Sequence, residues 1–124
     1  MKMPFIILTI LISAATANER PLFQDTLNDC NSGNARACFE AGQLYSNIIK
    51  NSQYNAANTA SKSAKLYKKS CELGYIKGCT AYGMSYYADK DRDPEKNDLY
   101  YFNKACEGGD EVGCRLLKMA PLLH

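Results

Sequence analysis

Apolar residues recur along the chain at the three- and four-residue steps that are typical of amphipathic helices. Ala64, Tyr67 and Cys71 share one helix face, and the stripe Leu99, Phe102 and Cys106 repeats that face later in the chain. The pattern predicts an all-α protein made of three helical hairpins, at residues 22–48, 58–88 and 95–119. The six helices are expected at residues 22–31, 34–48, 58–72, 75–88, 95–107 and 110–119.

Breaks between these helices are marked by polar and proline-containing segments. The Asn- and Ser-rich stretch 47–59 is interpreted either as an extended connection or as a lengthened helix start. A charged turn covers residues 89–94, and Pro94 is a good first helical residue behind Asp93 as N-cap. Pro121 is expected to end the last helix.

The predicted hairpins coincide with an internal repeat of the spacing Cys-x7-Cys. The first cysteines of successive units lie roughly 35 to 41 residues apart, a period typical of helical-hairpin solenoids. One Gly stands three residues after the first Cys of every unit, and in two units another Gly stands four residues after the second Cys. These glycines are Gly33, Gly74 and Gly109, and then Gly42 and Gly83.

The spacing has a geometric consequence for each unit. Two cysteines eight positions apart on one continuous helix would be separated by about 12 Å, whereas a disulfide requires Cα atoms within roughly 7 Å. A bridge within a unit therefore needs the chain to fold back, and the Gly after the first Cys is placed for a left-handed C-cap. A Gly inside the second helix costs roughly 1 kcal/mol relative to Ala, so its recurrence indicates a close approach between helices.

The N-terminal residues 1–17 have the features of a signal peptide. Lys2 precedes an apolar run at residues 5–12, and the small residues 15–17 would allow cleavage between Ala17 and Asn18. The run is far shorter than the roughly 20 residues of a membrane span. We therefore expect a secreted or periplasmic protein of residues 18–124, with no membrane attachment after signal removal.

Composition and charge exclude several classes of function. The formal net charge of +2 gives no basic footprint for nucleic acid. His124 is the single histidine, so a His-ligated zinc site or a His-dependent catalytic pair is not expected. An even number of cysteines in an exported chain indicates disulfides rather than metal ligands or catalytic thiols. We expect no metal and no cofactor.

The segments Ser70 to Cys79 and Ala105 to Cys114 share the pattern A/S-C-E-x-G-x-x-x-G-C. This pattern resembles the Sel1-like repeat in its disulfide-bearing form, as in the Helicobacter cysteine-rich proteins, and the similarity covers about residues 22–119. The resemblance implies an α/α superhelix of tetratricopeptide type and one disulfide within each repeat. The implied bridges are Cys30–Cys38, Cys71–Cys79 and Cys106–Cys114.

The chain departs from the family pattern in three places. The usual Gly-rich loop after the second helix is replaced by Tyr45-Ser46-Asn47-Ile48-Ile49 and by Tyr86-Tyr87-Ala88-Asp89-Lys90. The first unit has Asp29-Cys30-Asn31 in place of Ala-Cys-Glu. Any ligand groove is expected to be small, because the array has only three units.

Two functions are consistent with the resemblance. Some family members carry a label of weak β-lactam binding or hydrolysis, and others are interpreted as binding modules. The chain contains no Ser-x-x-Lys, the nearest match being Thr59 with Lys62, and it lacks the companion motifs of serine β-lactamases. Its acidic clusters at residues 91–95 and 110–111 are interpreted as turn and helix caps. We therefore assign no catalytic residue.

The preferred hypothesis is a secreted module that binds a protein, a peptide or a cell-wall fragment, with weak β-lactamase activity as the alternative. Repeat arrays bind extended ligands along exposed helix faces, and aromatic and basic residues there would suit an acidic peptide. Tyr67, Tyr82 and Tyr86 have the register of core residues. The expected binding stripe on the first helices of the second and third hairpins, which a purely solvated face would also explain, consists of Lys62, Leu66, Lys69, Asn97, Tyr101 and Lys104.

Overall fold

The computed structural model describes residues 19–51 and 56–123, and within these ranges the protein is all-helical. The signal peptide and cleavage site expected at residues 1–18 lie outside the described residues. The prediction of an all-α chain is confirmed. The elements are α2 (Glu19–Asn31), α3 (Ala35–Asn51), α4 (Ala56–Glu72), α5 (Ile76–Ser85), the 3-10 helix η1 (Tyr86–Ala88), α6 (Asp98–Glu107) and α7 (Glu111–Leu123).

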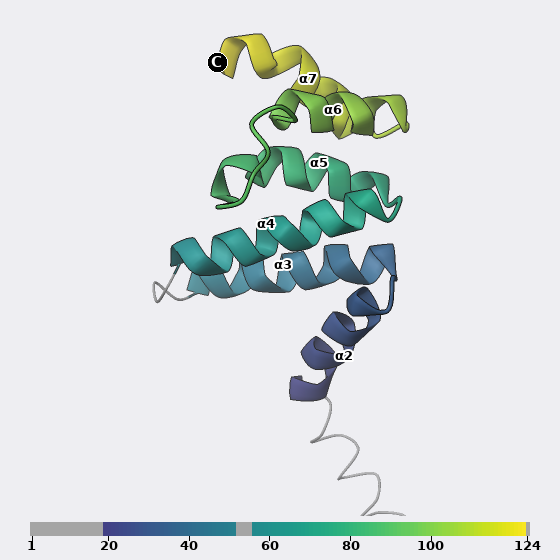
Figure 1. The fold of residues 1–124 in the computed structure, drawn as a ribbon, viewed down its shortest axis with the longest axis vertical. Helices are drawn as coiled ribbons and strands as arrows, with labels where there is room; N and C mark the ends of the chain where they lie inside the picture. Colours follow the sequence, from purple (N-terminus) through teal and green to yellow (C-terminus); the bar gives the residue numbers. More distant parts are fainter. Residues whose placement is uncertain (1–18, 52–55, 124) are drawn as a thin grey trace, which may run out of the picture.

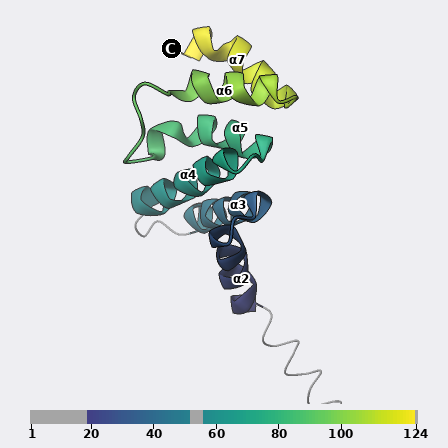
Figure 2. The ribbon, with the colours of Figure 1, turned by 45° about the vertical axis from the view of Figure 1, so that its right-hand side comes forward.

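The helices form an elongated stack in which each one packs on the next along the chain. Helices α2 and α7 lie at opposite ends of the long axis in both views (Figures 1 and 2). The second helices of the three hairpins also approach one another, because α5 contacts both α3 and α7. These second helices therefore form one row, along which side chains from different hairpins meet.

The same turn reverses the chain in all three hairpins. Gly33, Gly74 and Gly109 have φ angles of 100°, 102° and 97°, which only glycine adopts without strain. In the first turn, the Gly33 N–H donates to the carbonyl of Cys30, and the next N–H, that of Asn34, donates to the carbonyl of Asp29. The other two turns have the same pair of hydrogen bonds. The left-handed C-cap expected from the sequence is confirmed as a Schellman motif.

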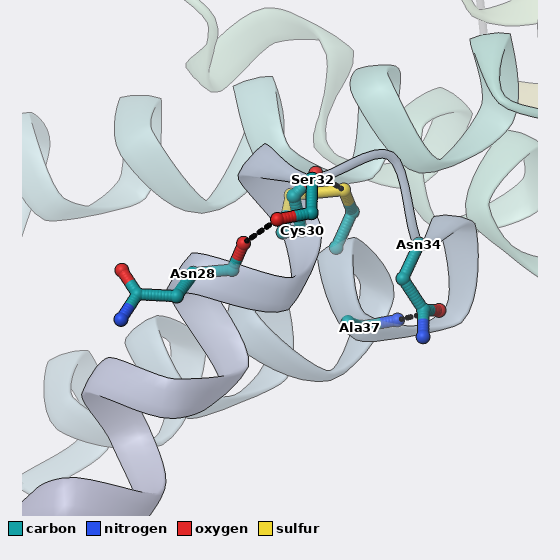
Figure 3. The surroundings of a disulfide bond; sticks show 6 residues. Asn28, Cys30, Ser32, Asn34 and Ala37 are labelled. Atoms are coloured by element: carbon teal, nitrogen blue, oxygen red, sulfur yellow. Dashed lines mark hydrogen bonds between the residues drawn. A yellow bond between two sulfur atoms is a disulfide. The ribbon is translucent and has the colours of Figure 1, made fainter.

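A disulfide closes each of these turns. The bridges are Cys30–Cys38, Cys71–Cys79 and Cys106–Cys114, with Cα–Cα distances of 4.5, 4.5 and 4.4 Å. In the first hairpin, the Asn34 side chain accepts a hydrogen bond from the N–H of Ala37 and so caps α3 beside the bridge (Figure 3). All six cysteines are paired, which is typical of proteins in an oxidising compartment such as the periplasm or the extracellular space.

Successive hairpins are joined by an aromatic ring that lies against a glycine. A Cβ atom placed on Gly42 would lie 2.6 Å from the ring of Tyr67, and one on Gly83 would lie 2.5 Å from the ring of Phe102. Both glycines stand four residues after the second Cys of one unit, and both rings stand four residues before the first Cys of the next unit. The close approach expected from the recurrent Gly is confirmed, and its partner is the following hairpin.

The polar stretch at 47–59 is mostly helical. Helix α3 continues to Asn51 and α4 begins at Ala56, so both helices extend into the segment that could have been an extended connection. Residues 52–55 lie outside the described residues. The additional residues of the first period therefore lengthen the helices of two hairpins.

Both predictions made from prolines are wrong. Asp93 and Pro94 belong to a turn, in which the Asp93 side chain accepts from the N–H of Glu95. Helix α6 begins only at Asp98, with the side chain of Asn97 as its cap. Pro121 lies inside α7, which runs to Leu123. A proline removes one backbone donor but keeps a helical φ, so a last turn can continue past it.

Replacing Gly83 by Ala tests the ring-on-glycine contact. We expect Gly83→Ala to lower the free energy of unfolding by roughly 1–3 kcal/mol, because the new methyl group overpacks against the Phe102 ring. In a Phe102→Ala background, the same change should become neutral or stabilising, since Ala favours the helix by about 1 kcal/mol over Gly. Urea unfolding of the oxidised protein measures both, and additive effects of the two changes would contradict the contact.

Candidate functional site

The expected binding stripe does not form one surface. Lys62 and Lys104 are exposed and Lys69 is half-buried, so these lysines remain candidates for contact with a partner. Asn97 uses its side chain to accept a hydrogen bond from the N–H of Tyr100. Leu66, which is partly buried, packs against the cluster of Cys30, Ala37 and Cys38 in the preceding hairpin.

Tyr101 is a core residue, so the expectation that it lies on the outer face of its helix is wrong. Its exposed fraction is 4%, and its ring packs edge-on against Tyr82 at a centroid distance of 4.6 Å. Helix α6 contacts both α5 and α7, and it therefore buries a wide arc that includes Tyr101, Phe102 and Ala105. The stripe through Leu99 and Cys106 is one edge of that arc, both residues being only half-buried.

A groove lies along the row of second helices, on a face for which the sequence gives no ligand signal. Its first hollow, of about 210 Å³, has an apolar wall from Phe39, Ala81, Met84 and Val112. A second hollow of about 300 Å³ shares Phe39, Ala81 and Met84 with the first. The two hollows therefore adjoin on side chains of α3 and α5.

The groove changes character along its length. A third hollow of about 310 Å³ is lined by Gln43, Ser46, Asn47 and Tyr67, and all of these except Asn47 also line the second hollow. We call the three together the second-helix groove. It runs from an apolar end at Met84 and Val112 to a polar end at Gln43, Ser46 and Asn47.

Several side chains hold the walls of the groove in place. The ring of Phe39 contacts Tyr67 and Tyr75 at centroid distances of 5.6 and 5.3 Å, which ties α3 to the second hairpin. At the apolar end, the hydroxyl of Thr80 donates a hydrogen bond to the carboxylate of Asp110. Met84, in contrast, is 67% exposed, so it presents an apolar surface that the protein itself does not cover.

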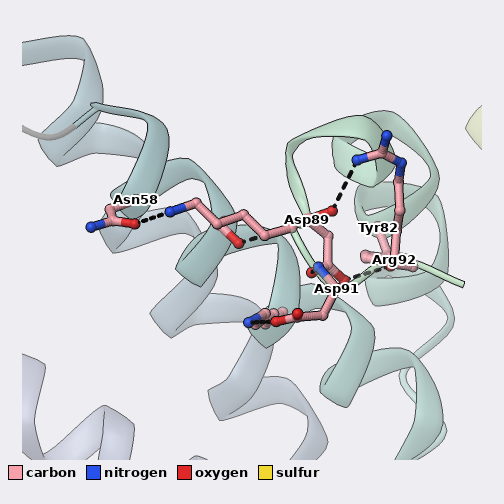
Figure 4. A network of polar contacts seen from close by, with 8 residues as sticks. Asn58, Tyr82, Asp89, Asp91 and Arg92 are labelled. Atoms are coloured by element: carbon pink, nitrogen blue, oxygen red, sulfur yellow. Dashed lines mark hydrogen bonds and ion pairs between the residues drawn. The ribbon is translucent and has the colours of Figure 1, made fainter.

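The loop after η1 is held by a polar network around Asp89 (Figure 4). The buried Asp89 carboxylate accepts from the hydroxyl of Tyr82 at 2.7 Å and from the N–H of Asp91 at 2.9 Å. Asp91 pairs with Lys65 of α4, and this hydrogen bond lowers the pKa of the Asp91 carboxyl. The carboxylates of this loop thus bind the loop to α4 and α5.

Ser70 has an unusual environment, because its buried hydroxyl has no hydrogen-bond partner. A Cβ on Gly78 would lie 2.4 Å from that oxygen, so the hydroxyl fills the contact between α4 and α5 and is closed to solvent. Ala105 occupies the same position in the third unit. The position is therefore one of tight packing, and a nucleophilic role for Ser70 has no access route.

Comparison with models of protein families, with curated proteins and with solved structures finds no match for this chain. Within residues 19–51 and 56–123, none of the helices combines the length and the apolar character that crossing a membrane requires. The same stretches hold no grouping of His, Cys, Asp and Glu side chains that would bind a metal ion.

Two serine substitutions should have opposite effects on stability. We expect Ser70→Ala to leave the free energy of unfolding unchanged or to raise it by up to about 1 kcal/mol, because it removes an unpaired buried hydroxyl. Ser63→Ala should lower it by roughly 1–2 kcal/mol, because the Ser63 hydroxyl donates to the carbonyl of Gly42 at 2.7 Å and that carbonyl would lose its bond. Urea unfolding of both variants measures the two changes. Equal losses of unfolding free energy would contradict the view that the Ser63 hydroxyl is hydrogen-bonded and the Ser70 hydroxyl is not.

The buried tyrosines predict a loss of stability in alkali. Burial raises the pKa of Tyr82 above its usual range, with a further contribution from the hydrogen bond to Asp89, and burial raises the pKa of Tyr101 to about 12. Above pH ~10 the unfolded chain loses phenolic protons that the folded state keeps, so stability falls as the pH rises. Each such group contributes a slope of up to about 1.4 kcal/mol per pH unit. Tyr82→Phe should make the alkaline decline in urea-unfolding stability less steep, and an unchanged slope would contradict this.

Proposed function

We propose that this protein is an exported Sel1-like repeat module, coiled as an α/α superhelix of tetratricopeptide type, that binds an extended peptide segment in the second-helix groove. The observation that carries the proposal is the continuity of the groove, whose successive hollows share lining side chains on α3 and α5. The Cys-x7-Cys register and its Gly positions support the assignment to Sel1-like repeats. Three disulfides support the oxidising location.

The dimensions of the groove favour a peptide over an enclosed small substrate. Pockets for small molecules usually surround most of the ligand, whereas the apolar hollow here, of about 210 Å³, opens to solvent beside Met84. That volume suits one large aliphatic or aromatic side chain. The neighbouring polar hollow supplies amide and hydroxyl groups from Gln43, Ser46 and Asn47, which are able to pair with the backbone of an extended segment.

One charged side chain at the rim of the apolar hollow is open to a ligand. Lys77 and Asp110 flank the apolar hollow. Asp110 is already engaged by Thr80, while Lys77 is exposed. A ligand with an apolar side chain followed by a carboxylate would therefore gain an ion pair with Lys77 at the rim, and such rim pairs mainly increase the rate of association.

A peptide-selection experiment tests the proposal. A displayed library of random peptides is panned on the oxidised protein, and the affinity of an enriched peptide is measured by calorimetry. We expect Met84→Lys to weaken binding about tenfold or more, since a central apolar contact often contributes ~2 kcal/mol or more. Met119→Lys is the matched control, because Met119 occupies the same register on α7, is also exposed and does not line the three hollows.

Three outcomes would contradict the proposal. The first is a library that yields no enriched peptide. The second is binding that is lost in Lys62→Glu and Lys104→Glu but kept in Met84→Lys, which would place the site on the first helices instead. The third is turnover of nitrocefin by the purified protein that disappears in Thr80→Val, because the Thr80 hydroxyl and its Asp110 partner would then form a catalytic pair in the same groove.

A further inference from the structure

Five tyrosine rings form an unbroken chain through the second and third hairpins. In order, they are Tyr87, Tyr86, Tyr82, Tyr101 and Tyr100, and the centroid distances between neighbours are 5.0, 5.9, 4.6 and 5.0 Å. All four contacts are edge-on, which is a favourable arrangement for aromatic pairs. The chain therefore brings together rings from α5, η1 and α6 without an intervening saturated side chain.

The two ends of this tyrosine chain reach solvent and its middle does not. Tyr87 and Tyr100 are 60% and 42% exposed, whereas Tyr82 has an exposed fraction of 0%. An electron removed from either outer ring by a solution oxidant can thus be replaced from the next ring inward. The chain links the surface to a phenol that no solution reagent contacts directly.

Tyr82 differs from its neighbours in its hydrogen-bond partner. Its hydroxyl donates to the carboxylate of Asp89 at 2.7 Å, whereas the hydroxyl of Tyr86 donates to the backbone carbonyl of Asp93. A carboxylate accepts a proton readily and a backbone carbonyl does not. Oxidation of a phenol makes its proton strongly acidic, so the proton of an oxidised Tyr82 has a base within hydrogen-bond distance.

The surrounding charges favour the same ring. The guanidinium of Arg92 lies 5.7 Å from the Tyr87 ring, and the ammonium of Lys96 lies 5.5 Å from the Tyr100 ring. A cation beside a ring opposes the removal of an electron from it. Lys68 lies 6.0 Å from the Tyr82 ring, but the anionic oxygen of Asp89 is much closer to the phenol, at 2.7 Å.

Burial adds a second reason for the oxidised state to rest at Tyr82. Asp89 is 1% exposed, and an anion held out of water carries a desolvation cost. Transfer of the Tyr82 proton to Asp89 converts this carboxylate to a neutral acid next to a neutral radical. Oxidation at this pair therefore removes a buried charge, whereas oxidation at an outer ring leaves that charge in place.

We propose that the tyrosine chain is a redox relay that takes one-electron oxidants at Tyr87 or Tyr100 and stores the oxidation as a tyrosyl radical at the Tyr82–Asp89 pair. The oxidants are of the class of peroxidase intermediates and inorganic radicals. The oxidant gains one electron from an outer ring, the vacancy passes inward, and Tyr82 loses its electron while the O–H bond breaks and the proton forms an O–H bond with Asp89. A small-molecule reductant such as ascorbate returns one electron through an outer ring, and Asp89 gives the proton back to the Tyr82 oxygen, which restores the phenol and the carboxylate.

Flash photolysis tests the relay on the full-length protein with its disulfides formed. Photogenerated tris(bipyridine)ruthenium(III) serves as the one-electron oxidant, and the tyrosyl radical is followed by transient absorption and by EPR. The wild type should give a long-lived radical whose EPR spectrum contains a hydrogen-bonded proton that exchanges in D2O. We expect the lifetime of the tyrosyl radical to fall about tenfold or more in Asp89→Asn. A change of ~1.4 kcal/mol in the free energy of the radical at Tyr82 relative to the outer rings alters its population at the protected ring by that factor.

The variants separate a relay from ordinary core packing. Asp89→Asn retains an oxygen that accepts the Tyr82 hydrogen bond but is too weak a base to take the proton, and Tyr82→Phe keeps the ring and removes the phenol. Both should raise the yield of dityrosine-linked dimers, because the oxidation then stays on exposed rings. Tyr45→Phe removes a tyrosine that contacts Phe23 outside the chain and should match the wild type.

The relay is overturned if the radical lifetime and the dimer yield of Asp89→Asn equal those of the wild type and of Tyr45→Phe. Circular dichroism and urea unfolding establish that each variant is folded before photolysis. If Tyr82→Phe does not fold, the D2O-sensitive EPR signal of the wild type and its loss in Asp89→Asn decide the question alone.

Discussion

The contact of an aromatic ring with a glycine of the preceding hairpin is the constraint on which the rest of the stack depends. Tyr67 lies against Gly42 and Phe102 lies against Gly83, at distances that leave no room for a Cβ atom. The first helix of one hairpin therefore packs on the second helix of the previous hairpin with only the aromatic ring between the two backbones. The ring of Tyr67 also lines the second-helix groove, so the contact that joins two hairpins shapes the candidate binding surface.

A different device holds each hairpin together internally. The Schellman turn at the positive-φ glycine directs the chain back, and the disulfide beside it joins the two helices. In the chain-entropy account, a bridge across so short a loop contributes on the order of 2–3 kcal/mol. The buried set contains many small and polar residues, among them Ser61, Ser63, Ser70 and Asp89, and a core of this kind gains less from apolar burial. The bridges therefore carry a large share of the stability of a chain that is usually stable by only ~5–15 kcal/mol.

The second hairpin contributes side chains both to the groove and to the tyrosine chain. Helix α5 presents Met84 to the groove and Tyr82 to the core. The loop after η1 carries Asp89, whose carboxylate accepts hydrogen bonds from the hydroxyl of Tyr82 and from the backbone N–H of Asp91. Helix α5 and the loop that follows it thus serve both the groove and the buried tyrosine chain.

The sequence by itself determined the features that depend on local chemistry. A glycine in the left-handed region and two cysteines eight positions apart restrict a hairpin through a few neighbouring residues, so the turns and bridges could be predicted. The recurrent Gly four residues after the second Cys likewise indicated a close helix contact. Local signals failed at Pro94 and Pro121, because both residues allow either a turn or a helix and the choice lies with their surroundings.

Only the tertiary structure decided which faces of the helices meet. The spacing of Tyr101 fits either an outer or an inner face, and its burial follows from α6 packing against two neighbours at once. The second-helix groove joins side chains of α3, α5 and α7, and the tyrosine chain joins α5, η1 and α6. Periodicity along one helix contains no information on the rotation of the next helix, which the packing of rings against glycines sets through space.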